Sequence, residues 1–218
     1  MKARAGWLAG VLLIPLAVRG PQSVPMPVTG DYLTEEFMKG LQETRSVADA
    51  LSRSPGPARA RVAAHKDGRE ISRGDLATDC GAALLHVDGS TEPAADTGDP
   101  AVHIVSSARF TTTLCAATGT FVHVGDHRHW ISNVILGGRY KDPRGTKFVF
   151  GSQGQATFGG RRHEWTIPLD APADRIEMDG VRYAWQLERG YLKIFPLSET
   201  GEPAAEPVWT LRRMVTDS

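Results

Sequence analysis

One stretch of the sequence, RIEMDGVRYAWQLERGYLKIF at residues 175–195, limits the possible folds more than any other. It holds two dipeptides, Asp179-Gly180 and Arg189-Gly190, and each lies between runs in which apolar and polar residues alternate. An Asp-Gly pair suits the positive φ angles of a two-residue hairpin turn, so we expect two consecutive hairpins. Counting outward from the turns gives these cross-strand pairs: Met178 with Val181, Glu177 with Arg182, Ile176 with Tyr183, Leu187 with Leu192 and Trp185 with Ile194.

These pairs gather apolar side chains on one face of a three-stranded meander. A shift of register by one residue would turn all of them toward water, so the pairing is strongly specified. The runs 147–150 and 155–158 repeat the pattern, with Phe148 opposite Phe158. Strands expected at 161–169 and 207–213 continue the alternation of short strands and turns. We therefore predict a mainly β protein, an antiparallel up-and-down meander or small barrel, with one N-terminal amphipathic helix.

The order of patterns along the chain predicts its organisation. We expect a signal peptide or N-terminal anchor at 1–20, a linker at 21–30, a helix packed on the β domain at 31–52, a turn-rich segment with a short strand at 53–100 and an antiparallel β domain at 101–214. The helix is indicated by the spacing of its apolar residues. In the β domain, strands at 120–124 and 129–136 are expected to flank a turn at 125–128.

The N-terminus has the layout of a secretory signal peptide, because Lys2 and Arg4 precede the apolar run at 7–18. We expect an exported protein, periplasmic or secreted, that meets the membrane only through this segment if the segment stays uncleaved. Export would place Cys80 and Cys115 in an oxidising compartment, where they are expected to form a disulfide; the alternative is two buried free thiols.

The charge balance bears on partners. Lys plus Arg and Asp plus Glu each number 25, so the formal net charge is zero. A nucleic-acid binder needs a basic excess to neutralise phosphates, and we therefore predict no nucleic-acid partner.

The segment from about 137 to 196 resembles the lipocalin-like domains of bacterial exported proteins. The resemblance rests on Gly138-Arg139-Tyr140, the aromatic strands with Ala156 and Phe158, Trp165, and the hairpin from Ile176 to Trp185. It implies a meander or barrel that binds a small ligand or another protein. A second similarity, to periplasmic inhibitors of C-type lysozyme, fails at the functional positions, where Leu136 and Gln153 stand.

Two sets of residues are candidates for a site. His163, Trp165, Tyr183 and Trp185 share the predicted inner face of the meander and could bind a ligand, although core packing is the simpler use of Tyr183 and Trp185. A second set, His123, His127 and His129 with Asp126 nearby, could hold a metal ion through mixed nitrogen and oxygen ligands, although the spacing matches no established zinc signature.

No catalytic motif stands out, since the sequence lacks a nucleophile elbow and a phosphate-cradling loop. We predict a non-enzymatic binding module without a cofactor, which recognises a protein partner or an apolar small ligand, as an envelope inhibitor would. The alternatives are a metal-dependent hydrolase that uses the histidine set and a structural envelope protein.

Overall fold

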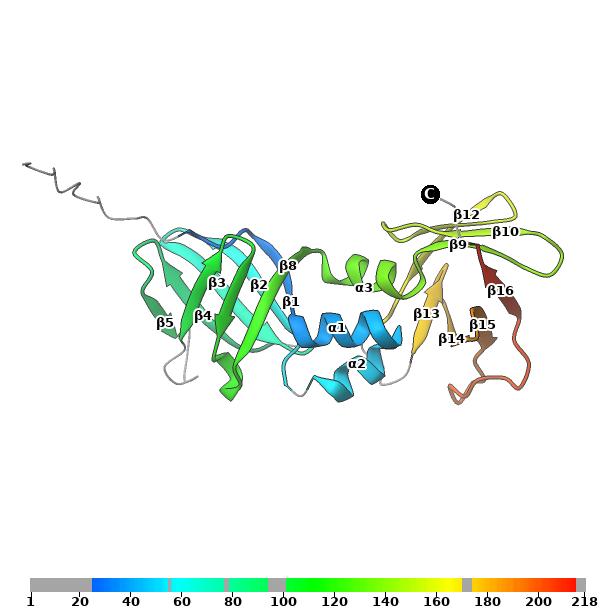
Figure 1. The fold of residues 1–218 in the computed structure, drawn as a ribbon, viewed down its shortest axis with the longest axis horizontal. Coiled ribbons are helices and arrows are strands. Elements are labelled where there is room, and N and C mark those ends of the chain that lie inside the picture. The colour runs from blue at the N-terminus through cyan, green and yellow to red at the C-terminus, as the bar shows by residue number, and fades with distance from the viewer. Residues whose placement is uncertain (1–24, 55, 77–78, 94–100, 170–173, 215–218) are drawn as a thin grey trace, which may run out of the picture.

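The computed structural model describes residues 25–54, 56–76, 79–93, 101–169 and 174–214. Two β units lie at opposite ends of an elongated molecule, and the helices lie between them (Figure 1). The predicted signal segment and residues 21–24 of the predicted linker lie outside the described residues. Within the described part of the chain, every helix is too short or too polar to cross a membrane.

The first β unit is an open antiparallel sheet of eight strands in the order β5-β4-β3-β2-β1-β8-β7-β6. Its core holds aromatic and aliphatic side chains such as Tyr32, Phe110 and Phe121. The strands are β1 Gly30–Thr34, β2 Arg59–His65, β3 Gly68–Gly74, β4 Asp79–His86, β5 Thr91–Pro93, β6 Val102–Ser106, β7 Arg109–Thr112 and β8 Gly119–Gly125, with the short 3-10 helix η1 at Leu114–Ala116.

The second unit is a closed antiparallel barrel in the order β10-β11-β12-β13-β14-β15-β16-β9. β9 closes it by pairing with both β10 and β16. The strands are β9 Gly138–Lys141, β10 Lys147–Phe150, β11 Gln155–Phe158, β12 Arg161–Thr166, β13 Arg175–Met178, β14 Val181–Glu188, β15 Tyr191–Pro196 and β16 Trp209–Arg213.

Three α-helices lie between the units: α1 Glu35–Thr44, α2 Val47–Arg53 and α3 His127–Leu136. Each has a side-chain cap at its N-terminus, where Thr34, Ser46 and Asp126 accept hydrogen bonds from the backbone. Apolar residues of all three helices share one core cluster with the barrel interior. The helices therefore seal one end of the barrel.

The sequence-based pairs in the meander are confirmed. Met178 lies opposite Val181, and Trp185 lies opposite Ile194. Phe148 lies opposite Phe158, as expected for the runs 147–150 and 155–158. The prediction that these apolar side chains share one buried face holds less well at the tip of the first hairpin. There Val181 is 52% exposed, because it lies at the end of the barrel. The prediction of a mainly β antiparallel fold with a small barrel is thus confirmed.

Several predicted boundaries differ from the structure. The single helix expected at 31–52 is the strand β1 followed by α1 and α2, which separate at Arg45, where φ is 58°. The segment 53–100 contributes four strands, β2 to β5, and the range 101–214 is divided between both β units. Local patterns locate strands but do not say which sheet each one joins.

The strand predicted at 129–136 is wrong, because these residues belong to α3. Asp126 starts the helix by accepting a hydrogen bond from the His129 backbone N–H, at 3.0 Å. Ile131 and Ile135 then lie one turn apart on the buried face. Short apolar runs fit either element by periodicity, and here the N-cap decides in favour of the helix.

The predicted disulfide is confirmed: Cys80 and Cys115 are joined with a Cα–Cα distance of 5.9 Å. The bond ties β4 to η1, where Cys115 has a positive φ of 64°. Such a bond is compatible with an exported protein.

Candidate functional site

The barrel end opposite the helices forms a mouth, which we define by the β9–β10 turn at 142–146, the β11–β12 turn at 159–160 and the start of β16. Aromatic rings from four strands, β11, β12, β14 and β16, meet there. The rings of His163 and Phe158 stack with centroids 4.7 Å apart, and Trp209 lies 6.0 Å from Phe158 and 5.5 Å from Tyr183. These four side chains are half-buried, so they form an aromatic surface that is partly open to solvent.

The mouth is hollowed by a cavity of about 500 Å³. Phe148, Phe158 and Trp209 give it an apolar floor, while Arg144 and Asp142 lie on the polar rim. Phe148 supports the floor from inside the barrel, since its ring lies 4.9 Å from that of Phe158. The cavity thus combines an aromatic floor with a polar rim, and apolar surface with a few placed polar groups is what small-ligand sites use.

His163 is held in a fixed orientation at the edge of this aromatic surface. Its Nδ1 donates to Asp179 Oδ2 at 2.7 Å, and Asp179 Oδ1 accepts from the Glu164 backbone N–H at 2.9 Å. The hydrogen bond from His163 lowers the pKa of Asp179, with a further contribution from the Glu164 N–H. Because Nδ1 is the donor, Nε2 of the neutral ring is an acceptor.

The four residues predicted to bind a ligand divide into two pairs. His163 and Tyr183 contribute to the aromatic surface of the mouth. Trp165 and Trp185 are 3% and 7% exposed and belong to the core. For Trp185 this agrees with the alternative use as a core residue. Trp165 also lines a polar cavity on the outer barrel surface, and Trp185 lines a different one beside α2.

The sequence did not assign Phe158 and Trp209 to a site. Phe158 was placed opposite Phe148 and Trp209 falls in the strand expected at 207–213, but only the closed barrel brings β11 and β16 to the same mouth. Trp209 is half-buried. The predicted strand at 207–213 contains Trp209 but does not identify its neighbours in the barrel.

The three histidines of the predicted metal site lie in different surroundings. The His123 ring packs against Tyr32 with centroids 5.0 Å apart, and its buried Nε2 has no hydrogen-bond partner among the described residues. His129 is about half exposed on the first turn of α3. His127 is buried and contacts Asp31. The predicted metal set therefore does not converge.

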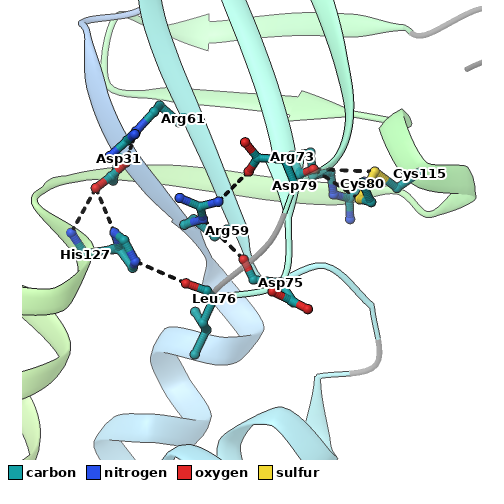
Figure 2. A network of polar contacts seen from close by, with 10 residues as sticks. All are labelled: Asp31, Arg59, Arg61, Arg73, Asp75, Leu76, Asp79, Cys80, Cys115 and His127. Carbon is teal, nitrogen blue, oxygen red and sulfur yellow. Dashed lines mark hydrogen bonds and ion pairs between the residues drawn. A yellow bond between two sulfur atoms is a disulfide. The ribbon is translucent and has the colours of Figure 1, made fainter. Parts of the chain in front are cut away.

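Asp31 and His127 form the centre of a buried polar junction between the open sheet and α3 (Figure 2). Asp31 Oδ2 accepts from His127 Nδ1 at 2.7 Å and from the His127 backbone N–H at 3.3 Å, while Oδ1 accepts from Arg61 Nε at 3.0 Å. His127 Nε2 faces the Leu76 carbonyl oxygen at 3.3 Å. Both ring nitrogens thus face acceptors, and only the doubly protonated ring donates to both.

The surroundings of Asp31 favour its ionised form. Burial raises the pKa of this carboxyl, but hydrogen bonds from His127 and Arg61 outweigh burial and hold the pKa well below its usual value of 3.8. Asp31 was not singled out in the sequence, because 96 residues separate it from His127. No local pattern signals such a contact.

Donor atoms of Asp31, Asp126 and His127 lie within 4.8 Å of one another, which is close enough for a metal ion to bridge them. However, the guanidinium of Arg61 already neutralises Asp31, and both nitrogens of His127 are engaged. A cation placed here would meet Arg61. We therefore interpret the junction as structural.

A further polar group in the open sheet supports this view of buried charges as structural. Arg73 is 2% exposed and lies next to the disulfide (Figure 2). Its Nη1 donates to the carbonyl oxygens of Thr112, Leu114 and Ala117. Its guanidinium also lies over the Phe121 ring, 4.9 Å from the centroid. The side chain thus satisfies backbone acceptors of the η1 turn.

The lowered pKa of Asp31 predicts how stability depends on pH. A carboxyl with a lowered pKa in the folded state contributes stability above its unfolded pKa, near 3.8, and this stability is lost as pH falls toward the lower folded value. Between about pH 5 and pH 2, the free energy of unfolding of the wild type should fall more steeply than that of Asp31→Asn. Urea unfolding at a series of pH values measures both slopes, and equal slopes would contradict the assignment.

Comparison of the chain with models of protein families, with curated proteins and with solved structures finds no match. The functional interpretation therefore rests on the geometry of the mouth and of the buried junction.

Proposed function

We propose that this protein is a non-enzymatic binding module that takes an apolar small ligand at the mouth of the barrel. The observation that carries the proposal is the connected set of half-buried rings, His163, Phe158, Trp209 and Tyr183, beside the cavity of about 500 Å³. Aromatic rings supply large apolar contact area, and the oriented His163 supplies one polar group that could fix a ligand's direction.

The other end of the barrel favours the mouth as the site of binding. The helices α1 and α3 fill that end with buried side chains such as Phe37, Ile131 and Ile135, which belong to the same core as the barrel strands. A ligand would displace close-packed core there, which is costly. At the mouth, by contrast, the rings are already partly exposed.

We further propose that the protein acts outside the cytoplasm, in the periplasm or as a secreted protein. The disulfide between Cys80 and Cys115 supports this, because such bonds persist in oxidising compartments. An apolar segment of a protein partner is the second kind of occupant that the same rings could accept. The metal-dependent hydrolase is not carried forward, because the three histidines do not converge.

Binding of decanol, a neutral probe with a single alkyl chain, tests the proposal. We expect saturable binding to the wild type, and Trp209→Ala should weaken it about tenfold by removing a central ring. Isothermal titration calorimetry measures both affinities. Val105→Ala, which trims a 54% exposed residue of the open sheet, is the matched control and should leave the affinity unchanged.

Two results would contradict the proposal. One is the absence of saturable decanol binding by the wild type. The other is equal affinity in the wild type and in Trp209→Ala, provided that circular dichroism shows both to be folded. A protein fragment that binds in place of decanol and loses affinity in Trp209→Ala would identify the occupant as a protein segment instead.

A further inference from the structure

A second cavity, of about 290 Å³, lies on the outer surface of the barrel directly beside the mouth. Lys141, Arg212 and Tyr191 line it. The two cavities share Asp142, Pro143 and Thr210, so they lie on either side of the same β9–β10 turn. A ligand that occupies the mouth can therefore reach the second cavity by passing around this turn.

The second cavity lies at a row of like charges on neighbouring strands. Lys147 is the cross-strand partner of Lys141, and Lys141 is the partner of Arg212. All three are exposed, and none forms an ion pair with another described residue. Adjacent strands lie about 4.8 Å apart, so the three cationic side chains start within about 10 Å of one another.

Elsewhere on the barrel surface, cross-strand charges have opposite signs. Arg182 pairs with Glu177 at 3.1 Å, and Lys193 bonds to Glu188 at 2.7 Å. Like charges directly opposite each other destabilise a sheet, and a bound anion would relieve that repulsion. The row at Lys147, Lys141 and Arg212 is thus distinct among the described charges of the barrel.

Among the described residues that line this cavity, the one carboxylate is already engaged. Asp142 Oδ1 accepts from the Thr146 backbone N–H at 2.7 Å, which holds the β9–β10 turn. Asp142 is not within ion-pair distance of Lys141 or Arg212. Lys supplies a compact point charge and Arg a planar fork, which together suit a phosphate or carboxylate group.

From this arrangement we infer that the ligand is an anionic amphiphile: its apolar chain would occupy the aromatic mouth, and its phosphate-like head group would bind between Lys141 and Arg212. This inference rests on the proposed binding at the mouth. It adds the class of ligand, namely a single molecule with one apolar and one anionic end, and it assigns a head-group site on the outer face of β9 and β16.

The test compares decyl phosphate with decanol, which differ in the head group, on the full chain at low ionic strength and below the concentration at which decyl phosphate forms micelles. We expect decyl phosphate to bind about tenfold more tightly than decanol. The double variant Lys141→Gln/Arg212→Gln should lose this preference while binding decanol as the wild type does. Arg162→Gln removes one exposed charge from β12, outside the second cavity, and should retain the preference.

The outcomes separate this inference from the proposed function. Equal affinity of the wild type for decanol and decyl phosphate, unchanged in the double variant, would overturn the head-group site and leave binding at the mouth intact. Binding of neither compound would overturn both. Inorganic phosphate that binds as tightly as decyl phosphate would overturn the amphiphile, because the chain would then contribute nothing.

Discussion

Replacing His127 by Ala is expected to lower the free energy of unfolding by about 3–5 kcal/mol, because it leaves the Asp31 carboxylate buried without its main partner. Asp31 and His127 have side chains that are only 6% and 5% exposed. Arg61 still reaches Asp31, but its side chain is 57% exposed and pairs with the other oxygen. Urea denaturation at neutral pH, followed by circular dichroism, measures the change.

His129→Ala is the matched control, since this histidine lies two residues further along α3 and its side chain is 52% exposed. We expect its effect to stay within about 0.5 kcal/mol. The double variant Asp31→Ala/His127→Ala should cost less than the sum of the two single changes, because each single change already breaks the same pair. Additive effects would show that the two residues act independently.

Loss of the disulfide is the second large effect that we expect. Replacing Cys80 and Cys115 by Ser opens a loop with a sequence separation of 35 residues, which in the chain-entropy model costs about 4 kcal/mol. The loss of stability should affect the open sheet most, because the bond holds η1 against β4 there.

Thermal and urea unfolding of the double Ser variant measure this cost. Reduction of the wild type with dithiothreitol should give a similar decrease in stability, which controls for the effect of the Ser side chains. Decanol binding by the folded variant should persist, because the mouth belongs to the other β unit. A Ser variant as stable as the wild type would contradict the expectation.

Parts of the fold governed by local rules could be predicted. The meander followed from the alternation around Asp179-Gly180 and Arg189-Gly190, because a two-residue turn fixes the register of its strands. Both turns have the positive φ angles that this requires, at Asp179, Gly180, Arg189 and Gly190. The cysteine pair needed only the expected compartment and an even count.

Other parts depend on contacts between distant segments. β1 lies between β2 and β8, and nothing in residues 30–34 specifies β8 as a neighbour. The run at 129–136 was misassigned because eight mostly apolar residues fit a strand or a helix. Asp31 and His127 are 96 residues apart, and most strands of the open sheet lie between them in the sequence. No spacing rule would therefore reveal their contact.

The candidate site could be predicted only in part, because it too depends on contacts between distant segments. His163 and Tyr183 were identified because hairpin registers place them on an inner face. Phe158 and Trp209 complete the surface only through closure of the barrel by β9. The basic row of Lys147, Lys141 and Arg212 depends on the same closure, since these residues come from three strands.

Photo-crosslinking tests the central claim, that the mouth binds an apolar chain, most directly. The probe is a decyl chain that carries a diazirine, and labelled peptides are mapped by mass spectrometry. The account predicts saturable labelling of peptides that contain Phe158 and Trp209, with excess decanol competing for it. Labelling spread over peptides of the open sheet, or labelling that decanol does not reduce, would contradict it.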